Sequence, residues 1–397
     1  MKISILNVLT ALFVVACVPA VEMPGVLDPL DDPKWKECAD QLAARQEQAM
    51  LDDLMLDTQR LVCQGVVTAE EGRVDKSMSL LSQAAVKDPK DHRPHYLAGR
   101  ILTDAGRYDE ALTEFDRSHE RYPSLEIPTE RLGRTIKKTK GPEEAAAFLE
   151  RAMERKLCSY GCMSLLAETY HELDKDVFAK PVYEKMTAEE PWEPGGFVGL
   201  ASLSNTESDF IKEVFYLDKA TSAKNFGELS PEQQASIYYS LAFAKYNSKD
   251  YDGAASVIDK AIGLNGDRAD WQLLAGWINL KRGNAAGAVT AFEAAEQIDF
   301  NLVAIPEGIG DAKLELEDIP GAESAYRRAH RLDRGNAIVT LKLAHAVALN
   351  EDLAAAKKLK KEAVETAGEA GLPKDLLDTV TALIKSLKQK KEAASAE

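Results

Sequence analysis

The chain has 397 residues, of which 45% are hydrophobic and 29% are charged, and its formal net charge is −16. This composition is that of a folded protein with enough apolar residues for a sizeable core. The acidic balance argues against nucleic acid as a main partner, because phosphate binding depends on clustered Lys and Arg.

The first 16 residues have the pattern of a bacterial export signal. Lys2 precedes an apolar run that is too short to span a bilayer. The run ends in VVAC (14–17), which resembles a lipobox, and this resemblance implies that Cys17 receives lipid and becomes the mature N-terminus. Val18 stands where the retention signal of the inner membrane has Asp, which implies an outer-membrane lipoprotein facing the periplasm. The alternative is cleavage after Ala20, which leaves a soluble periplasmic or secreted protein.

The next two segments are predicted to be a tether and a capping helix. Residues 17–33 contain four prolines, which keep the backbone extended and non-helical. Residues 34–57 are predicted to form a helix that caps the N-terminal end of the repeats described next. The apolar stripe of this helix consists of Trp35, Cys38, Leu42, Met50, Leu54 and Leu56.

The stretch 92–125 is the best copy of a recurring sequence pattern. It has Gly99, Gly106, Tyr108, Ala111, Phe115 and Pro123 at offsets 8, 15, 17, 20, 24 and 32 of a 34-residue frame. The spacing resembles that of a tetratricopeptide repeat. The resemblance implies a helical hairpin in which Gly106 makes the turn and Phe115 fills the seam between the two helices.

The same frame fits nine repeats in succession. Repeats 1 to 5 begin at 58, 92, 126, 160 and 194 and fill 58–234, and repeats 6 to 9 begin at 235, 269, 303 and 337 and fill 235–370. One hairpin cannot bury both of its apolar faces, so stacked copies are expected. The resemblance thus implies an all-α fold, a right-handed superhelical solenoid of about nine hairpins with a capping helix at each end.

The fifth repeat departs from this frame. It is seven residues longer than the others, and the extra residues are placed at 224–230. Offset 20 is Ser or Ala in the other eight repeats and is Glu213 in this one. The sequence 204–207 is predicted to be a capping box that opens the second helix, and Ser230 is predicted to open the next repeat. The insertion is either a bend in the array or a longer loop without a mechanical role.

Residues 371–397 are predicted to be a closing helix and a polar tail. Pro373 starts the helix, which covers the open end of the last repeat. Its apolar face consists of Leu376, Leu377, Val380, Leu383, Ile384 and Leu387.

Four cysteines remain besides Cys17, an even number in a chain directed to an oxidising compartment. Four cysteines allow three pairings. The preferred one joins Cys158 to Cys162 across a turn between repeats and joins Cys38 to Cys63, which ties the capping helix to the first repeat. A metal site is the weaker alternative, because the spacing lacks the Cys-x-x-Cys and paired-His patterns of zinc sites.

No motif in the chain indicates an enzyme. The six histidines form no HExxH helix and are predicted to be ordinary residues of the repeat surface. The sequence has no phosphate-binding GxxxxGK[ST] loop, no GxSxG elbow and no dinucleotide fingerprint. We therefore expect neither a catalytic site nor a cofactor or metal.

The tetratricopeptide resemblance also implies where a partner binds. In that family the first helix of each hairpin lines a concave groove, with offsets 2, 5, 9, 12 and 13 pointing into it. In repeats 2 and 3 these offsets give a predicted basic strip, which suits an acidic or C-terminal peptide. The strip consists of Arg93, Tyr96, Arg100, Arg134, Lys137 and Lys138.

In repeats 6 and 7 the same offsets give a predicted aromatic patch. Buried aromatic anchors dominate binding energy in many interfaces, and Trp277 is the favoured anchor. The patch has an acidic border of Glu307, Asp311 and Glu315. The alternative is that some of the rings pack between neighbouring repeats. The patch consists of Tyr239, Phe243, Tyr246 and Trp277, with Leu273 beside them.

These observations favour a non-catalytic scaffold that is anchored by lipid in the bacterial envelope and binds other proteins through its groove. Outer-membrane lipoproteins of this repeat family serve in pilus and secretin assembly, barrel-protein assembly, motility complexes and polysaccharide export. The alternative is a carbohydrate-binding scaffold, in which Trp277 and Tyr239 stack on the sugar rings of peptidoglycan or of an exported polysaccharide. Contact with the membrane is expected only through the N-terminal lipid.

Overall fold

The computed structural model describes residue 30 and residues 32–48, 54–123 and 127–394. The described residues are helical apart from turns and short connections, and they contain no β-strand. The expected all-α repeat architecture is therefore confirmed. The leader, Cys17 and most of the predicted tether lie outside the described residues.

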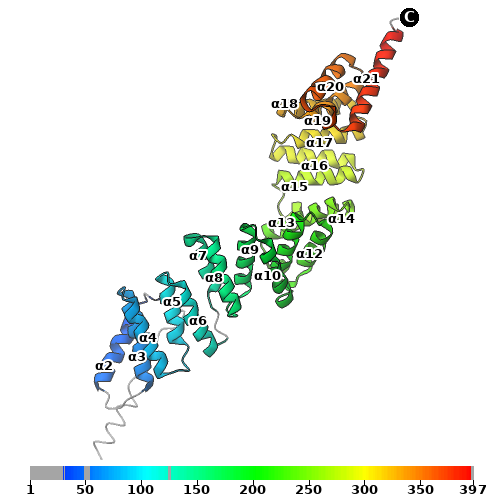
Figure 1. Cartoon of the computed structure of the whole chain (residues 1–397). Coiled ribbons are helices and arrows are strands. Elements are labelled where there is room, and N and C mark those ends of the chain that lie inside the picture. Colours follow the sequence, from blue (N-terminus) through cyan, green and yellow to red (C-terminus); the bar gives the residue numbers. More distant parts are fainter. Residues whose placement is uncertain (1–29, 31, 49–53, 124–126, 395–397) are drawn as a thin grey trace, which may run out of the picture. The chain divides into compact units, whose positions relative to one another are not determined.

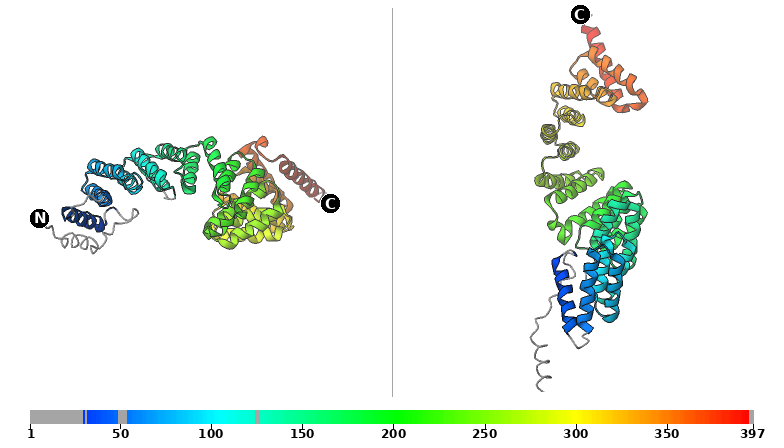
Figure 2. Two further views of the ribbon diagram at one scale, coloured as in Figure 1. Left: turned by 90° about the horizontal axis from the view of Figure 1, so that it is seen from below. Right: turned by 90° about the vertical axis from the view of Figure 1, so that its left-hand side faces the viewer.

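The chain divides into two compact parts, residues 1–182 and residues 183–397, and the division falls inside helix α10. In each part the helices pair in chain order, and each hairpin packs on the next (Figures 1 and 2). The N-terminal part holds α2 (Pro33–Gln48), α3 (Leu54–Glu70), α4 (Val74–Lys87), α5 (Arg93–Asp104), α6 (Tyr108–Arg121), α7 (Thr129–Lys140), α8 (Pro142–Glu154), α9 (Tyr160–Glu172) and the start of α10 (Asp176–Glu189).

The C-terminal part continues the same alternation of first and second helices. It holds α11 (Gly195–Thr206), α12 (Phe210–Ser222), the 3₁₀ turn η1 (Lys224–Glu228), α13 (Pro231–Asn247), α14 (Tyr251–Leu264), α15 (Ala269–Lys281), α16 (Ala285–Ile298), α17 (Ala304–Glu315), α18 (Ile319–Leu332), α19 (Ala337–Leu349), α20 (Leu353–Ala367), the 3₁₀ turn η2 (Glu369–Gly371) and α21 (Lys374–Ala394).

The seam of each hairpin depends on a small residue at offset 8. A Cβ atom on Gly99 of α5 would lie 2.7 Å from the ring of Phe115 on α6, so any larger side chain would displace that ring. Phe115 itself is completely buried. The sequence prediction that Phe115 fills the seam between the two helices is confirmed.

The turn inside eight of the nine hairpins uses a left-handed residue at offset 15, and the exception is the turn between α7 and α8. Gly106 has φ +73°, a conformation that glycine adopts without the steric cost that other residues meet. The same position is left-handed in seven further repeats, which shows that the hairpin geometry overrides residue preference. The residues are Gly72, Asp174, Ser208, Lys249, Gly283, Glu317 and Glu351.

The two parts differ in how their second helices begin. In the C-terminal part every second helix starts at an Asp or Asn whose side chain accepts a hydrogen bond from the backbone N–H three residues on. In the N-terminal part α4, α6 and α8 start at Arg73, Arg107 and Gly141, which make no side-chain cap. Side-chain caps contribute about 1 kcal/mol each.

Two predicted helix boundaries were wrong. The helix expected over 34–57 is α2, which begins at Pro33 and ends at Gln48, and Leu54 already belongs to α3, the first helix of repeat 1. Met50 lies outside the described residues. The capping box expected at 204–207 is the end of α11, because the Ser204 hydroxyl donates back to the Leu200 carbonyl (2.9 Å) and the helix continues.

Three further sequence predictions of local structure agree with the observed helices. Ser230 and Gln233 form a reciprocal capping box at the start of α13. The extra residues of repeat 5 form η1, whose Phe226 is buried against the ring of Tyr238 (centroids 5.3 Å apart). At the C-terminal end α21 packs Val380 and Leu387 into the cores beside α19 and α20.

Candidate functional site

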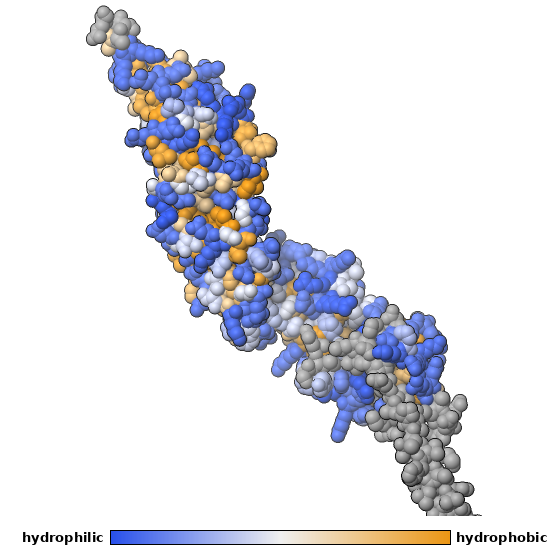
Figure 3. Space-filling view, turned by 180° about the vertical axis from the view of Figure 1, so that it is seen from behind, coloured by the Kyte–Doolittle hydropathy of each residue, from blue (hydrophilic) through white to orange (hydrophobic). Residues whose placement is uncertain are grey.

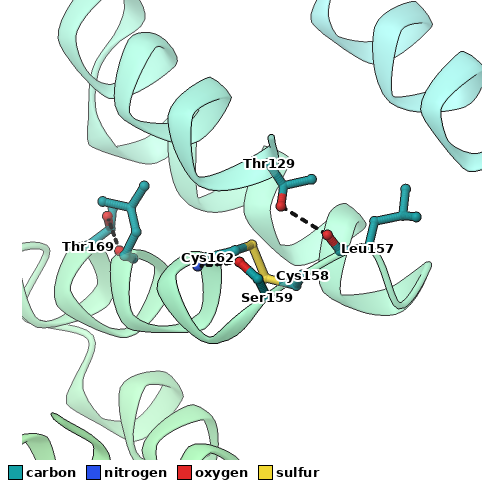
Figure 4. Close-up of a disulfide and its surroundings, with 7 residues drawn as sticks. Thr129, Leu157, Cys158, Ser159, Cys162 and Thr169 are labelled. Atoms are coloured by element: carbon teal, nitrogen blue, oxygen red, sulfur yellow. Dashed lines mark hydrogen bonds between the residues drawn. A yellow bond between two sulfur atoms is a disulfide. The ribbon is translucent and has the colours of Figure 1, made fainter. Parts of the chain in front are cut away.

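The structure pairs the four cysteines as the sequence prediction does. Cys38 of α2 is joined to Cys63 of α3, with Cα atoms 6.2 Å apart, and Cys158 is joined to Cys162 of α9, with Cα atoms 5.2 Å apart. The second bridge closes the turn between α8 and α9 (Figure 4). The Leu157 carbonyl of this turn accepts a hydrogen bond from the hydroxyl of Thr129 on α7 (2.9 Å).

The predicted basic strip of the N-terminal part is largely neutralised by carboxylates of the chain itself. Arg93 Nη2 lies 2.8 Å from Asp91 Oδ2, and Arg134 Nη2 lies 2.9 Å from Glu130 Oε1. Lys137 pairs with Glu172. Asp91 raises the pKa of Arg93 through its hydrogen bonds. These side chains are therefore not the free cations that the groove offsets predict.

The remaining members of the strip have different roles. Tyr96 was wrongly predicted to face a partner: it is 3% exposed, and its ring packs edge-on against Phe115 (centroids 5.5 Å apart). Arg100 lines a cavity of about 870 Å³ between α3, α5 and α7, together with Arg131. Lys138 is exposed to solvent.

The rings of the predicted aromatic patch divide into packed and exposed ones. Tyr239 of α13 stacks on the buried Trp271 of α15, with centroids 5.5 Å apart, and lies 6.5 Å from Phe243. Phe243 is 38% exposed. Trp277, the favoured anchor, is partly buried with its ring edge-on to Phe292 (5.1 Å). Tyr246 is partly buried 5.7 Å from the ring of Tyr251, so Phe243 is the most accessible of the four rings.

The predicted acidic border of this patch is also paired within the chain. Lys342 Nζ lies 2.7 Å from both Glu307 Oε1 and Asp311 Oδ2, and the Tyr326 hydroxyl donates to Asp311 Oδ1 (2.6 Å). Only Glu315 of the three is exposed. The border was therefore wrongly predicted to offer free charge at Glu307 and Asp311, since sequence offsets do not reveal that Lys342 of α19 pairs with both.

A cavity of about 390 Å³ lies between the first helices α11 and α13, with α12 beneath it. Its polar lining consists of Ser202, Asn205, Glu213 and Ser240. Its apolar lining consists of Val198, Ala201 and Leu217 and the rings of Tyr239 and Phe243. The cavity thus joins the exposed ring of the aromatic patch to the irregular fifth repeat.

Glu213 is the functional candidate that the groove offsets missed. It is 4% exposed, and Asn205 Nδ2 donates to its Oε1 (3.1 Å) and Oε2 (3.0 Å). Burial raises the pKa of Glu213, and the hydrogen bonds from Asn205 oppose that rise. The signal that the sequence offered for Glu213 was its position. Offset 20 lies on the second helix of the repeat, and the residue there is small in every other repeat.

The described residues provide no metal site and no membrane span. They contain no group of three or more His, Cys, Asp or Glu side chains that could hold a metal ion. None of the described helices is both long and apolar enough to cross a membrane. His95 was predicted to be a surface residue but is 9% exposed, with its Nδ1 2.6 Å from Glu114 Oε2.

The visible face in Figure 3 differs between the two parts: hydrophobic residues gather there over the C-terminal helices, whereas the N-terminal helices are mostly hydrophilic. Individual exposed apolar side chains of the C-terminal part include Phe300, which is 71% exposed. Scattered exposed apolar residues are ordinary on protein surfaces, so this face alone does not identify a site.

The comparisons with known proteins agree with the repeat pattern. The family model of the tetratricopeptide repeat matches residues 67–126 and 239–300. These two stretches are of the tetratricopeptide type, and of the hairpins outside them all but α7–α8 have the same left-handed turn residue. Repeat proteins of this kind generally present extended surfaces that bind other proteins. No curated protein matches the sequence.

Several solved structures are similar to parts of the chain at low identity. The Pseudomonas aeruginosa protein pilF is 17% identical over 54% of this chain and 93% of its own, with a TM-score of 0.43. YrrB, described as a TPR protein with an unusual peptide-binding site, is 15% identical over 52% of this chain and 97% of its own, with a TM-score of 0.41. Yeast Tom70 is 13% identical over 91% of this chain and 87% of its own, with a TM-score of 0.38.

Proposed function

We propose that the protein is a non-catalytic interaction scaffold that captures a peptide segment of a partner protein on the first helices of its C-terminal part. The observation that carries the proposal is the cavity between α11 and α13, with the exposed ring of Phe243 at its wall. Because it lies between the first helices of two successive hairpins, an extended peptide can cross it while one side chain enters.

The energetics of the site favour a peptide anchored by few contacts. A well-packed aromatic anchor contributes about 2 kcal/mol or more to binding, whereas an exposed ion pair contributes less than about 1 kcal/mol. The charges predicted for the groove elsewhere are mostly paired within the chain. Binding through Phe243 and its neighbours is therefore preferred to binding through the basic strip.

The carbohydrate-binding alternative has less support from the same packing. Stacking on a sugar needs an open ring face, and Tyr239 is stacked against Trp271 while Trp277 lies against Phe292. Both rings are partly buried. The exposed Phe243 has no polar atom with which to bind sugar hydroxyls.

We also propose that the scaffold is held in the bacterial envelope by a lipid on Cys17, as part of a multiprotein machine for pilus assembly or secretion, motility or outer-membrane assembly. The two disulfides support export, because such bridges persist in oxidising compartments. Palmitate labelling of the wild type and of Cys17→Ala in a bacterial host tests the anchor. Labelling that is lost in the variant is expected, and equal labelling of both would contradict it.

Peptide capture is tested by site-specific crosslinking in cells. A photoreactive p-benzoylphenylalanine replaces Ser202, which is exposed and lines the cavity, or Ser256, which is exposed on the second helix α14. We expect discrete protein adducts from position 202 that are weakened about tenfold by Phe243→Ala, and none from position 256. Equal adducts from both positions would contradict capture at this cavity.

A further inference from the structure

Glu213 occupies a position that is otherwise reserved for small side chains. Offset 20 lies on the second helix of each repeat, and the residue there is buried. The other eight repeats have there a Ser or Ala that is completely buried: Ser77, Ala111, Ala145, Ala179, Ala254, Ala288, Ala322 and Ala356. Repeat 5 alone places a carboxyl group at the same depth.

The carboxyl group of Glu213 has no cationic partner among the described residues. Its hydrogen bonds there come from Asn205 alone. Lysines of its own helix α12 and of α13 are directed to other carboxylates: Lys212 Nζ lies 2.7 Å from Asp209, and Lys245 Nζ lies 3.5 Å from Asp218. Lys219 lies over the ring of Phe215.

A buried carboxylate of this kind favours a cation that can reach it. A carboxylate offers about four lone-pair sites, of which one amide group satisfies two at most. Burying the charge without a cation is costly, and the cost falls when a hydrogen-bonding cation enters the same site. Glu213 lines the cavity, so a group that enters from solvent can reach its carboxyl oxygens.

The walls of the cavity suit a cation carried on an alkyl chain. Val198 and Leu217 provide aliphatic surface for a stem, and Phe243 and Tyr239 add aromatic rings to the lining. Aromatic faces attract Lys and Arg head groups, and long basic side chains bury their stems against apolar surface while the head stays polar. The volume of about 390 Å³ lies near the lower end for ligand pockets, about 300–1,000 Å³.

We propose that this cavity receives one Lys or Arg side chain of the captured peptide, with Glu213 as its ionic partner, Asn205 orienting the carboxyl group and Phe243 covering the stem. The inference rests on the proposed peptide capture and assigns the chemistry of one side chain of the partner. A metal ion suits the cavity less well, because Glu213 is its only carboxylate among the described residues.

The experiment selects a displayed library of random dodecapeptides on the full-length protein and on three variants. Glu213→Gln removes the charge and keeps the shape, and Glu213→Ala restores the side chain of the other repeats. Glu207→Gln is the matched control, because it removes one charge from an exposed site just beyond α11. Thermal unfolding of each variant shows whether it is folded.

We expect the wild type and Glu207→Gln to select peptides that share one Lys or Arg position, and both Glu213 variants to select peptides without it. For a selected peptide, Glu213→Gln should weaken binding at least tenfold. Changing the shared basic residue to norleucine should weaken binding to the wild type by a similar factor and binding to Glu213→Gln by less than twofold.

Two other outcomes are distinct from each other. Peptides selected without a shared basic residue, or with one that persists in Glu213→Gln, would overturn the cation site and leave peptide capture standing. Enrichment of no peptide by the folded wild type would overturn peptide capture, and the cation site with it.

Discussion

The N-terminal and C-terminal parts use the same hairpin and present different surfaces. In the N-terminal part the groove offsets carry cations. Arg93 and Arg134 pair with carboxylates nearby in the sequence, and Lys137 pairs with a carboxylate of α9. In the C-terminal part the same offsets carry rings beside a cavity whose buried carboxyl group, Glu213, has no such partner among the described residues. The comparison teaches that the offset of a residue predicts its direction, whereas the carboxylates and cations around it, on its own helix or the next, decide whether its charge is paired.

The largest expected effect tests what the two parts have in common. Phe115→Ala in the N-terminal part and Phe292→Ala in the C-terminal part should each lower the free energy of unfolding by about 3–5 kcal/mol, because each removes a completely buried ring. Urea denaturation followed by circular dichroism measures both. A loss of less than about 1 kcal/mol of unfolding free energy in either variant would show that the ring does not fill the hairpin seam as described.

The next effect separates the surfaces of the two parts. Phe243→Ala should weaken binding of a selected peptide by about 2 kcal/mol, roughly 30-fold, with little change in stability, because the ring is a partly exposed anchor. The matched control is Phe300→Ala, which removes an exposed ring of the same part outside the cavity. Isothermal titration should give unchanged affinity for the control, and equal losses in both variants would exclude a specific role for Phe243.

A smaller effect follows from the difference in helix caps. Asp352→Ala at the start of α20 should destabilise the protein by about 1 kcal/mol, since its side chain accepts a hydrogen bond from the Ala355 N–H (3.0 Å). Arg73→Ala at the start of α4 should cost less than about 0.5 kcal/mol, because Arg73 makes no cap and its ion pair with Glu71 is exposed. Chemical denaturation of both variants compares them directly.

The smallest effect concerns the pH dependence of Glu213. Burial raises its pKa in the folded state, so the stability that it contributes is present at low pH and is lost as the pH rises above about 4, the range in which an unfolded glutamate ionises. Glu213→Gln should therefore raise Tm by about 2 °C at pH 7, which corresponds to roughly 0.5–1 kcal/mol, and leave it nearly unchanged near pH 3. A Tm of Glu213→Gln below that of the wild type at pH 7 would contradict the predicted direction of the change.

Much of the fold was predictable because the repeat imposes one constraint many times. The roles of Gly99 and Phe115 could be predicted because the two helices of a hairpin pack closely only with a small residue opposite a large one. The same 34-residue spacing predicted the positions of the later hairpins. The predicted helix start at 204–207 was wrong because a serine can stand either at the start or in the interior of a helix. In the structure the Ser204 hydroxyl donates a hydrogen bond to the Leu200 carbonyl of the preceding turn.

The candidate site was less predictable because its properties depend on contacts between helices. The offsets located Tyr239 and Phe243 correctly on the first helix, and the packing alternative that the sequence left open applies to Tyr239 and Trp277. Tyr96 shares its offset with Tyr239 but is buried in the seam. In the sequence Glu213 stood out only as the residue that breaks the Ser or Ala pattern of offset 20. Its role as a candidate site residue became visible only with the position of Asn205 and of the cavity beside it.

The ring of Phe292 has a consequence for how such a chain can change its length. It fits against Gly276 in its own hairpin and against Gly308 in the next, where a Cβ atom would lie 2.5 Å from the ring. This seam is thus shared between repeats 7 and 8. A gene duplication or deletion of one whole 34-residue copy keeps each ring opposite the glycine or alanine of its own hairpin. Any other change of length removes that match unless the surplus residues fold outside the seam, as in η1.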